Sequence, residues 1–63
     1  MKNRAVTGFD IRIDGVWRSF RDQQAAAYDA ALIRKKKNPS AVVTITSTAS
    51  GAVITMLEDG RTA

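Results

Sequence analysis

The side chains that could do chemistry in this chain are few, and they are of types that act poorly near neutral pH. The sequence contains no histidine and no cysteine, so it lacks imidazole for general acid–base catalysis and a thiol nucleophile. The available carboxylates are Asp10, Asp14, Asp22, Asp29, Glu58 and Asp59. Asp10 and Asp14 would lie on one strand face with Arg12 between them, which is typical of a solvated face. We therefore expect a protein that is not an enzyme.

Motifs for metals and cofactors are missing as well. The composition excludes zinc sites built from cysteine or histidine. The four glycines, at positions 8, 15, 51 and 60, are isolated turn residues rather than a phosphate-binding loop. The sequence thus predicts no catalytic residue, no cofactor and no metal.

One group of residues has the composition of a nucleic-acid-binding surface, in which aromatic side chains stack on bases and cations neutralise phosphates. This candidate interaction surface consists of Trp17, Arg12, Arg18, Arg34, Lys35, Lys36 and Lys37. A structural explanation competes with it. Cations in the last turn of a helix are stabilised by the helix dipole, and a tryptophan packs readily on a cross-strand arginine.

The overall charge permits an acidic partner without demanding one. Ten Lys and Arg against six Asp and Glu give a net charge of +4, and four of these cations form the run 34–37. No apolar segment approaches the roughly 18 residues that a membrane span needs, and no apolar stretch follows the cations near the N-terminus. We therefore expect a soluble protein without a membrane partner. We expect it to be cytoplasmic, because a chain without cysteine fits a reducing compartment.

A β-hairpin is expected to position Trp17 and its neighbouring arginines. Residues 9–14 alternate apolar and polar side chains, which indicates a half-buried strand. Asp14-Gly15 favours a two-residue type I′ turn, so residues 16–20 should fold back on that strand. This turn pairs Ile13 with Val16, Arg12 with Trp17, Ile11 with Arg18 and Phe9 with Phe20. The core face would then carry Phe9, Ile11, Ile13, Val16 and Phe20, with Trp17 on the other face.

A helix is expected to position the basic run. The alanine-rich stretch 23–37 has high helix propensity, and Asp22 is its predicted N-cap, with Ser19 as the alternative. The basic run and Asn38-Pro39 should end the helix. The apolar residues form two stripes, Tyr28 with Leu32 and Ala26 with Ala30 and Ile33. Either alanine is simply tolerated on an exposed face, or the helix also packs on a second subunit.

Residues 41–48 and 52–58 are rich in Val, Ile and Thr and predict a second hairpin. Two registers are open. A two-residue Ser50-Gly51 turn pairs Ile45 with Met56, and a three-residue loop pairs Ile45 with Thr55 and Val43 with Leu57. In either register Val53 and Leu57 lie opposite Ile54 and Met56, so one of these pairs faces away from the helix and needs cover.

The order of these features has a parallel in other proteins. The chain contains, in this order, a strand, Asp14-Gly15, Trp17 to Phe20, an alanine-rich helix and Asn38-Pro39. In this order it resembles small uncharacterised proteobacterial proteins. It is also similar to the broader group of β-β-α-β-β domains of unknown function. The resemblance implies an antiparallel sheet with one helix across it, and it brings no activity, cofactor or catalytic residue.

These observations predict a single α+β domain over residues 1–63, a two-layer sandwich in which one helix packs across a mostly antiparallel sheet of about four strands. Residues 1–7 and 59–63 are expected to be frayed tails. So small a core buries only about 60% of the surface of the unfolded chain. We therefore expect a homodimer, or association with another protein.

The predicted function is that of a non-enzymatic, self-associating binding module. Nucleic-acid binding through the candidate surface is the alternative, and inhibition or regulation of a larger protein is a third. Salt discriminates the first two, because nucleic-acid binding weakens steeply with ionic strength and an apolar dimer does not.

Overall fold

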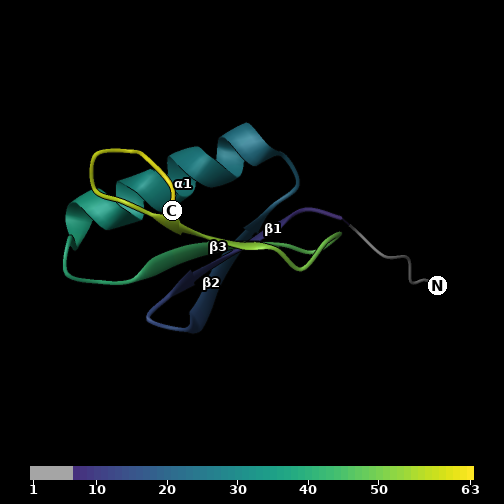
Figure 1. Ribbon diagram of the computed structural model, residues 1–63, viewed down its shortest axis with the longest axis horizontal. Helices are drawn as coiled ribbons and strands as arrows, with labels where there is room; N and C mark the ends of the chain where they lie inside the picture. Colours follow the sequence, from purple (N-terminus) through teal and green to yellow (C-terminus); the bar gives the residue numbers. More distant parts are fainter. Residues whose placement is uncertain (1–6) are drawn as a thin grey trace.

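One helix crosses one face of a four-stranded antiparallel sheet in the computed structural model (Figure 1). The elements are β1 (Phe9–Ile13), β2 (Val16–Arg21), α1 (Gln24–Lys37), β3 (Val43–Ser47) and β4 (Val53–Met56). Their spatial order in the sheet is β2-β1-β3-β4. The predicted two-layer α+β arrangement and the β-β-α-β-β order are confirmed. The structure describes residues 7–63, so the predicted frayed segment 1–7 lies outside the described residues except for Thr7.

The first hairpin turns at Asp14-Gly15, as predicted. Both residues have positive φ, 53° for Asp14 and 82° for Gly15, which a type I′ turn requires. Asp14 also joins this turn to the segment before β3. Its backbone N–H donates to the Val42 carbonyl at 2.8 Å, and its carboxylate accepts from the Val42 N–H at 2.9 Å.

The pairing of β1 with β2 contains a β-bulge, which the alternation of the sequence does not predict. The pairs Ile13 with Val16 and Arg12 with Trp17 are as predicted, but Ile11 then pairs with Ser19 instead of Arg18. Arg18 is therefore the extra residue of the bulge, and every later pair is displaced by one position.

The bulge moves Phe20 off the predicted core face. Phe20 pairs with Asp10 rather than with Phe9, so its half-buried ring lies on the side of the sheet away from the helix. Val16 shares the face of Ile13 as predicted, yet it is 52% exposed. The reason is that β2 is an edge strand, while the helix covers the two central strands.

The core lies between α1 and the central strands. Its buried members are Ile11, Ala27, Ala31, Val43, Ile45 and Met56, with Tyr28, Ala30 and Leu32 packed beside them. Ala27 and Ala31 are fully buried because their small side chains let the helix approach the sheet closely. Both predicted helix stripes thus have members against the sheet, whereas Ile33 is 56% exposed.

The helix begins one residue later than predicted and ends where predicted. Its N-cap is Gln23, without a side-chain cap hydrogen bond, so the predicted caps Asp22 and Ser19 were wrong. The bulge accounts for the shift, because β2 continues to Arg21 and leaves Asp22 within the connection. At the other end the Asn38 N–H donates to the Arg34 carbonyl at 3.1 Å, and Pro39 follows.

The second hairpin has neither of the two predicted registers. Ile45 pairs with Ile54 and Val43 with Met56, around a four-residue loop of 48–51. Gly51 has a φ of 77° in this loop, and its N–H donates to the Ser47 carbonyl at 2.8 Å. Ile54 and Met56 face the helix, and Val53 faces away from it.

The C-terminal segment, predicted to be frayed, pairs with the outer edge of β4. Thr55 and Ala63 exchange two backbone hydrogen bonds of 3.0 and 2.9 Å, and Thr62 forms a bridge with Met56. Gly60 has a φ of 90° in the reversal, which passes beside the helix (Figure 1). Hydrogen bonding of this kind covers an otherwise unpaired sheet edge.

Candidate interaction surfaces

Trp17 and Arg12 form the cross-strand pair that the sequence predicts, on the side of the sheet away from the helix. Each side chain is held by a further hydrogen bond. The Trp17 Nε1–H donates to Asp10 Oδ1 at 3.1 Å, and Arg12 Nη1 donates to Thr46 Oγ1 at 3.1 Å. Asp10 and Arg12 are therefore engaged within the sheet surface, and Asp10 orients the Trp17 indole.

Trp17 belongs to a wider surface, which we call the open sheet face because no described residue covers it. In the strands it consists of Asp10, Arg12, Trp17, Phe20, Thr44, Thr46, Val53 and Thr55, and Val42 continues it before β3. Three apolar members are strongly exposed: Trp17 by 54%, Val42 by 53% and Val53 by 58%. One carboxylate and one guanidinium make the face electrically neutral.

Arg18 lies on the opposite side of the sheet from Trp17, although the two are neighbours in sequence. As the bulge residue it lines an open cleft of about 330 Å³, together with Arg34 and Lys37 from the last turn of α1. Ile13 and Asn38 complete the lining. The structure thus brings three of the predicted cations together and separates them from the predicted aromatic.

Lys35 and Lys36, the remaining members of the predicted surface, have different surroundings. Lys35 Nζ donates to the Pro39 carbonyl at 2.9 Å and to the Ala41 carbonyl at 2.7 Å, so it fastens the chain that leaves the helix. Lys36 is exposed and lines neither described pocket. The seven predicted residues therefore occupy several separate environments rather than one surface.

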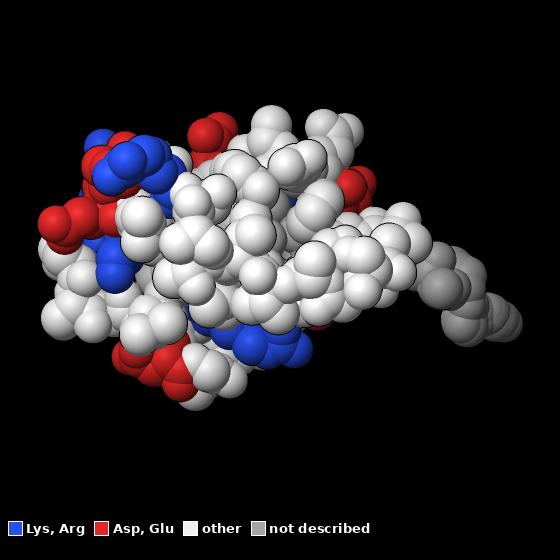
Figure 2. All heavy atoms as spheres, viewed as in Figure 1, with Lys and Arg blue, Asp and Glu red and all other residues white. Residues whose placement is uncertain are grey.

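Charged side chains are dispersed on the face shown in Figure 2, where small red and blue clusters lie around a large uncharged area. Within residues 7–63 the only ion pair joins Arg61 Nε to Asp59 Oδ2 at 2.7 Å. The Arg61 backbone N–H, followed by the Arg61 side chain, lowers the pKa of the Asp59 carboxyl from its ordinary value of 3.8. This pair closes the C-terminal reversal, and both side chains are well exposed.

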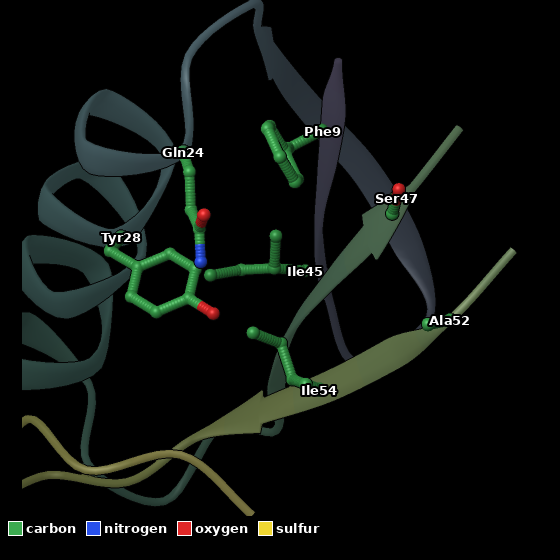
Figure 3. A pocket seen from close by; sticks show the side chains of 7 residues that line it. All are labelled: Phe9, Gln24, Tyr28, Ile45, Ser47, Ala52 and Ile54. Carbon is green, nitrogen blue, oxygen red and sulfur yellow. The ribbon is translucent and has the colours of Figure 1, made fainter. Parts of the chain in front are cut away.

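A second, smaller cavity of about 190 Å³ opens between the first half of α1 and the sheet (Figure 3). Phe9, Ile45 and Ile54 point toward it from the strands, and Gln24 and Tyr28 point toward it from the helix. Its lining includes no carboxylate. The cavity could therefore hold an apolar group, but its lining supplies no carboxylate as a general base.

Two further observations bear on the kind of site that the described residues can form. No cluster of three or more potential metal ligands occurs within residues 7–63. In the same part of the chain, no helix has the length and apolar character needed to cross a bilayer.

Comparison with family models, with curated proteins and with solved structures finds no match to this chain. The family resemblance therefore stays a prediction, and the surfaces are interpreted from their own geometry.

Sequence reasoning missed two apolar members of the open sheet face, Phe20 and Val42. Phe20 was assigned to the core because nothing in the sequence marks Arg18 as a bulge. Val42 could have been found, since strict alternation from the buried Val43 places it on the opposite face.

Proposed function

We infer that this chain is a non-enzymatic binding module that associates with a second copy of itself through the open sheet face. The observation that carries this proposal is the gathering of Trp17, Val42 and Val53, each more than half exposed, on one uncovered face. Single exposed apolar side chains need no explanation, but several on one face are typical of an interaction surface.

A second copy is the occupant that the charges favour. The whole chain carries +4, so most pairings of two copies bring like charges together. On the open sheet face Asp10 and Arg12 cancel, so two copies can meet there without net repulsion. A twofold axis would set this surface against itself, as in most homodimers.

Association along the sheet edge is less favoured. β4 is already paired by the C-terminal segment, and β2 carries the Arg18 bulge, which interrupts the regular hydrogen-bonding edge. Bulges and charged side chains are the usual means of protecting an edge strand. The open sheet face carries three of the five large apolar side chains that are more than half exposed within residues 7–63.

Nucleic-acid binding through Trp17 and the basic cluster together has less support. Trp17 lies on the open sheet face, whereas Arg18, Arg34 and Lys37 line a cleft on the helix side. Among residues 7–63, a strand of bases stacked on Trp17 would meet Arg12 as the only cation in the strands of that face. The proposal retains a cytoplasmic location, because the chain has no cysteine.

The test compares Val53→Lys with Ile33→Lys, since Val53 and Ile33 are 58% and 56% exposed on the sheet and the helix respectively. Sedimentation velocity over a dilution series gives the dimer dissociation constant, and Trp17 fluorescence is recorded on the same samples. We expect Val53→Lys to weaken the dimer by about tenfold or more, because it buries an unpaired charge. Ile33→Lys should change it by less than about twofold.

Wild-type emission should shift to the red as the dimer dissociates, because Trp17 becomes exposed to water. Circular dichroism of each variant confirms that the fold is intact. A wild-type chain that stays monomeric, with Trp17 exposed to water throughout, would contradict the proposal. Loss of the dimer in Ile33→Lys alone would place the interface on the helix instead.

A further inference from the structure

We propose that Arg18, Arg34 and Lys37 form a binding site for a phosphate group in the cleft at the C-terminal end of α1. The cleft has a volume of about 330 Å³ and is lined by these three cations, Asn38 and Ile13, without any carboxylate. This site lies on the helix side of the sheet, so the proposal does not depend on association through the open sheet face.

The position of Arg18 is the observation that distinguishes a site from ordinary helix stabilisation. Arg34 and Lys37 are explained by the helix dipole alone, because cations in a last turn offset its partial negative charge. Arg18 comes from a strand, so the dipole does not explain why it is there. Arg18 nevertheless lines the same cleft as Arg34 and Lys37, and it does so from a β-bulge, a feature that is over-represented beside functional sites.

The three cations also have no carboxylate partner within residues 7–63, where Asp59 and Arg61 form the only ion pair. Gathering three positive charges around one cleft costs electrostatic free energy, and a bound dianion would offset it. The helix C-terminus contributes only about half a negative charge, which is much less than the three cations supply.

The donors present fit the oxygens of a phosphate group. A guanidinium offers paired N–H donors in a planar fork and an ammonium offers three more, so two arginines and a lysine can surround a tetrahedral oxyanion. The side-chain oxygen of Asn38 accepts a hydrogen bond from Ser40 Oγ at 3.0 Å. This orients the Asn38 amide so that its nitrogen is the end that can donate.

The experiment is an NMR titration with inorganic phosphate at constant ionic strength, repeated with glycerol phosphate. We expect saturable shifts at Arg18, Arg34, Lys37 and Asn38, including the arginine Nε–H signals, with dissociation constants of about 1–10 mM. Saturation by inorganic phosphate alone indicates a site for the free ion, and saturation by both indicates recognition of the phosphate group itself. Either result supports the proposal.

The variants Arg18→Gln and Arg34→Gln should each weaken binding by about tenfold. Lys36→Gln is the matched control, because it removes the same charge from the same helix turn but lies outside the cleft. It should weaken binding by less than about twofold, since an exposed charge is screened. Backbone amide spectra establish that each variant keeps its fold.

Three results would overturn the proposal. The first is the absence of saturable shifts, and the second is an equal loss of affinity in Lys36→Gln and Arg18→Gln, which would mean general charge attraction. The third is tight binding of a short oligothymidine, with Lys36→Gln and Arg18→Gln lowering the affinity for it equally. That result would replace the cleft with an extended basic surface for nucleic acid.

Discussion

Gly8 is the glycine at which the fold can least accommodate an added side chain. It is buried just before β1, and a Cβ atom built on it would meet the Phe20 ring and would lie 2.7 Å from the Arg21 carbonyl oxygen. The Gly8 backbone cannot easily move away. Its N–H donates to Thr48 Oγ1 at 2.8 Å, and its carbonyl accepts from the Thr48 N–H at 2.9 Å.

We expect Gly8→Ala to lower the free energy of unfolding by about 1–3 kcal/mol, because the added methyl group overpacks a site that cannot relax. Urea unfolding followed by circular dichroism measures the change at one fixed protein concentration. Thr7→Ala is the control, since Thr7 is exposed, and should stay within about 0.5 kcal/mol of wild type. Wild-type stability in Gly8→Ala would mean that Phe20 is not packed over this backbone.

Three of the six carboxylates have structural tasks. Asp10 accepts the Trp17 indole N–H and Asp14 accepts the Val42 N–H. Asp59 accepts from the Arg61 backbone and side chain. Each of these groups is used for a turn or for orienting a neighbour, which supports the proposal of a binding module over that of an enzyme.

At the scale of the elements, Lys35 connects the helix to β3. Its ammonium donates to two carbonyls of the connecting chain, those of Pro39 and Ala41, at 2.9 and 2.7 Å. We expect Lys35→Met to lower the free energy of unfolding by about 1 kcal/mol, because both carbonyls lose a charged donor. Chemical denaturation of the variant against wild type measures this difference.

Lys36→Met provides the comparison for Lys35→Met. It removes the same charge from the same last turn, so any loss of helix-dipole stabilisation is common to both variants. Because Lys36 is exposed and makes no side-chain hydrogen bond within residues 7–63, its replacement should cost less than about 0.5 kcal/mol. Equal losses in the two variants would show that only the charge of Lys35 matters.

The β-bulge is the element that decides what each surface contains. One extra residue in β2 takes Arg18 out of the pairing with Ile11, puts Phe20 on the open sheet face and extends β2 to Arg21, so that α1 begins at Gln24. A regular hairpin would have paired Arg18 with Ile11 and set its charge beside the core. The cost of burying a charge there explains physically why the regular register is avoided.

At the scale of the whole molecule, the open sheet face and the basic cleft lie on opposite sides of the sheet. The open sheet face is neutral, whereas Arg18, Arg34 and Lys37 gather at the helix end. Such a division lets one surface meet a second copy while the other meets an anion, since neither has to satisfy both requirements.

This separation predicts the salt dependence of the dimer. Because the contact is apolar and neutral, raising the NaCl concentration from about 50 mM to about 500 mM should change the dissociation constant by less than about threefold. Sedimentation equilibrium at each salt concentration measures it. A tenfold or larger weakening would instead mean that ion pairs hold the two copies together, contrary to an interface on the open sheet face.

Local physical chemistry in the sequence determined the elements and their order. The alternation from Phe9, the positive φ required at Asp14-Gly15 and the alanine-rich stretch before Asn38-Pro39 each predict a segment correctly. The pairing of Arg12 with Trp17 also followed, since it lies within reach of the turn that sets it. These features depend on neighbours a few residues apart.

Only the tertiary structure decided where the surfaces lie. The bulge at Arg18 displaces the later pairs of β1 with β2 by one residue, and the four-residue loop of the second hairpin sets a register that turn residues alone left open. The meeting of Arg18 with Arg34 and Lys37 joins a strand to a helix end. Such contacts depend on how whole elements pack, because one residue of register moves a side chain from one face of a sheet to the other.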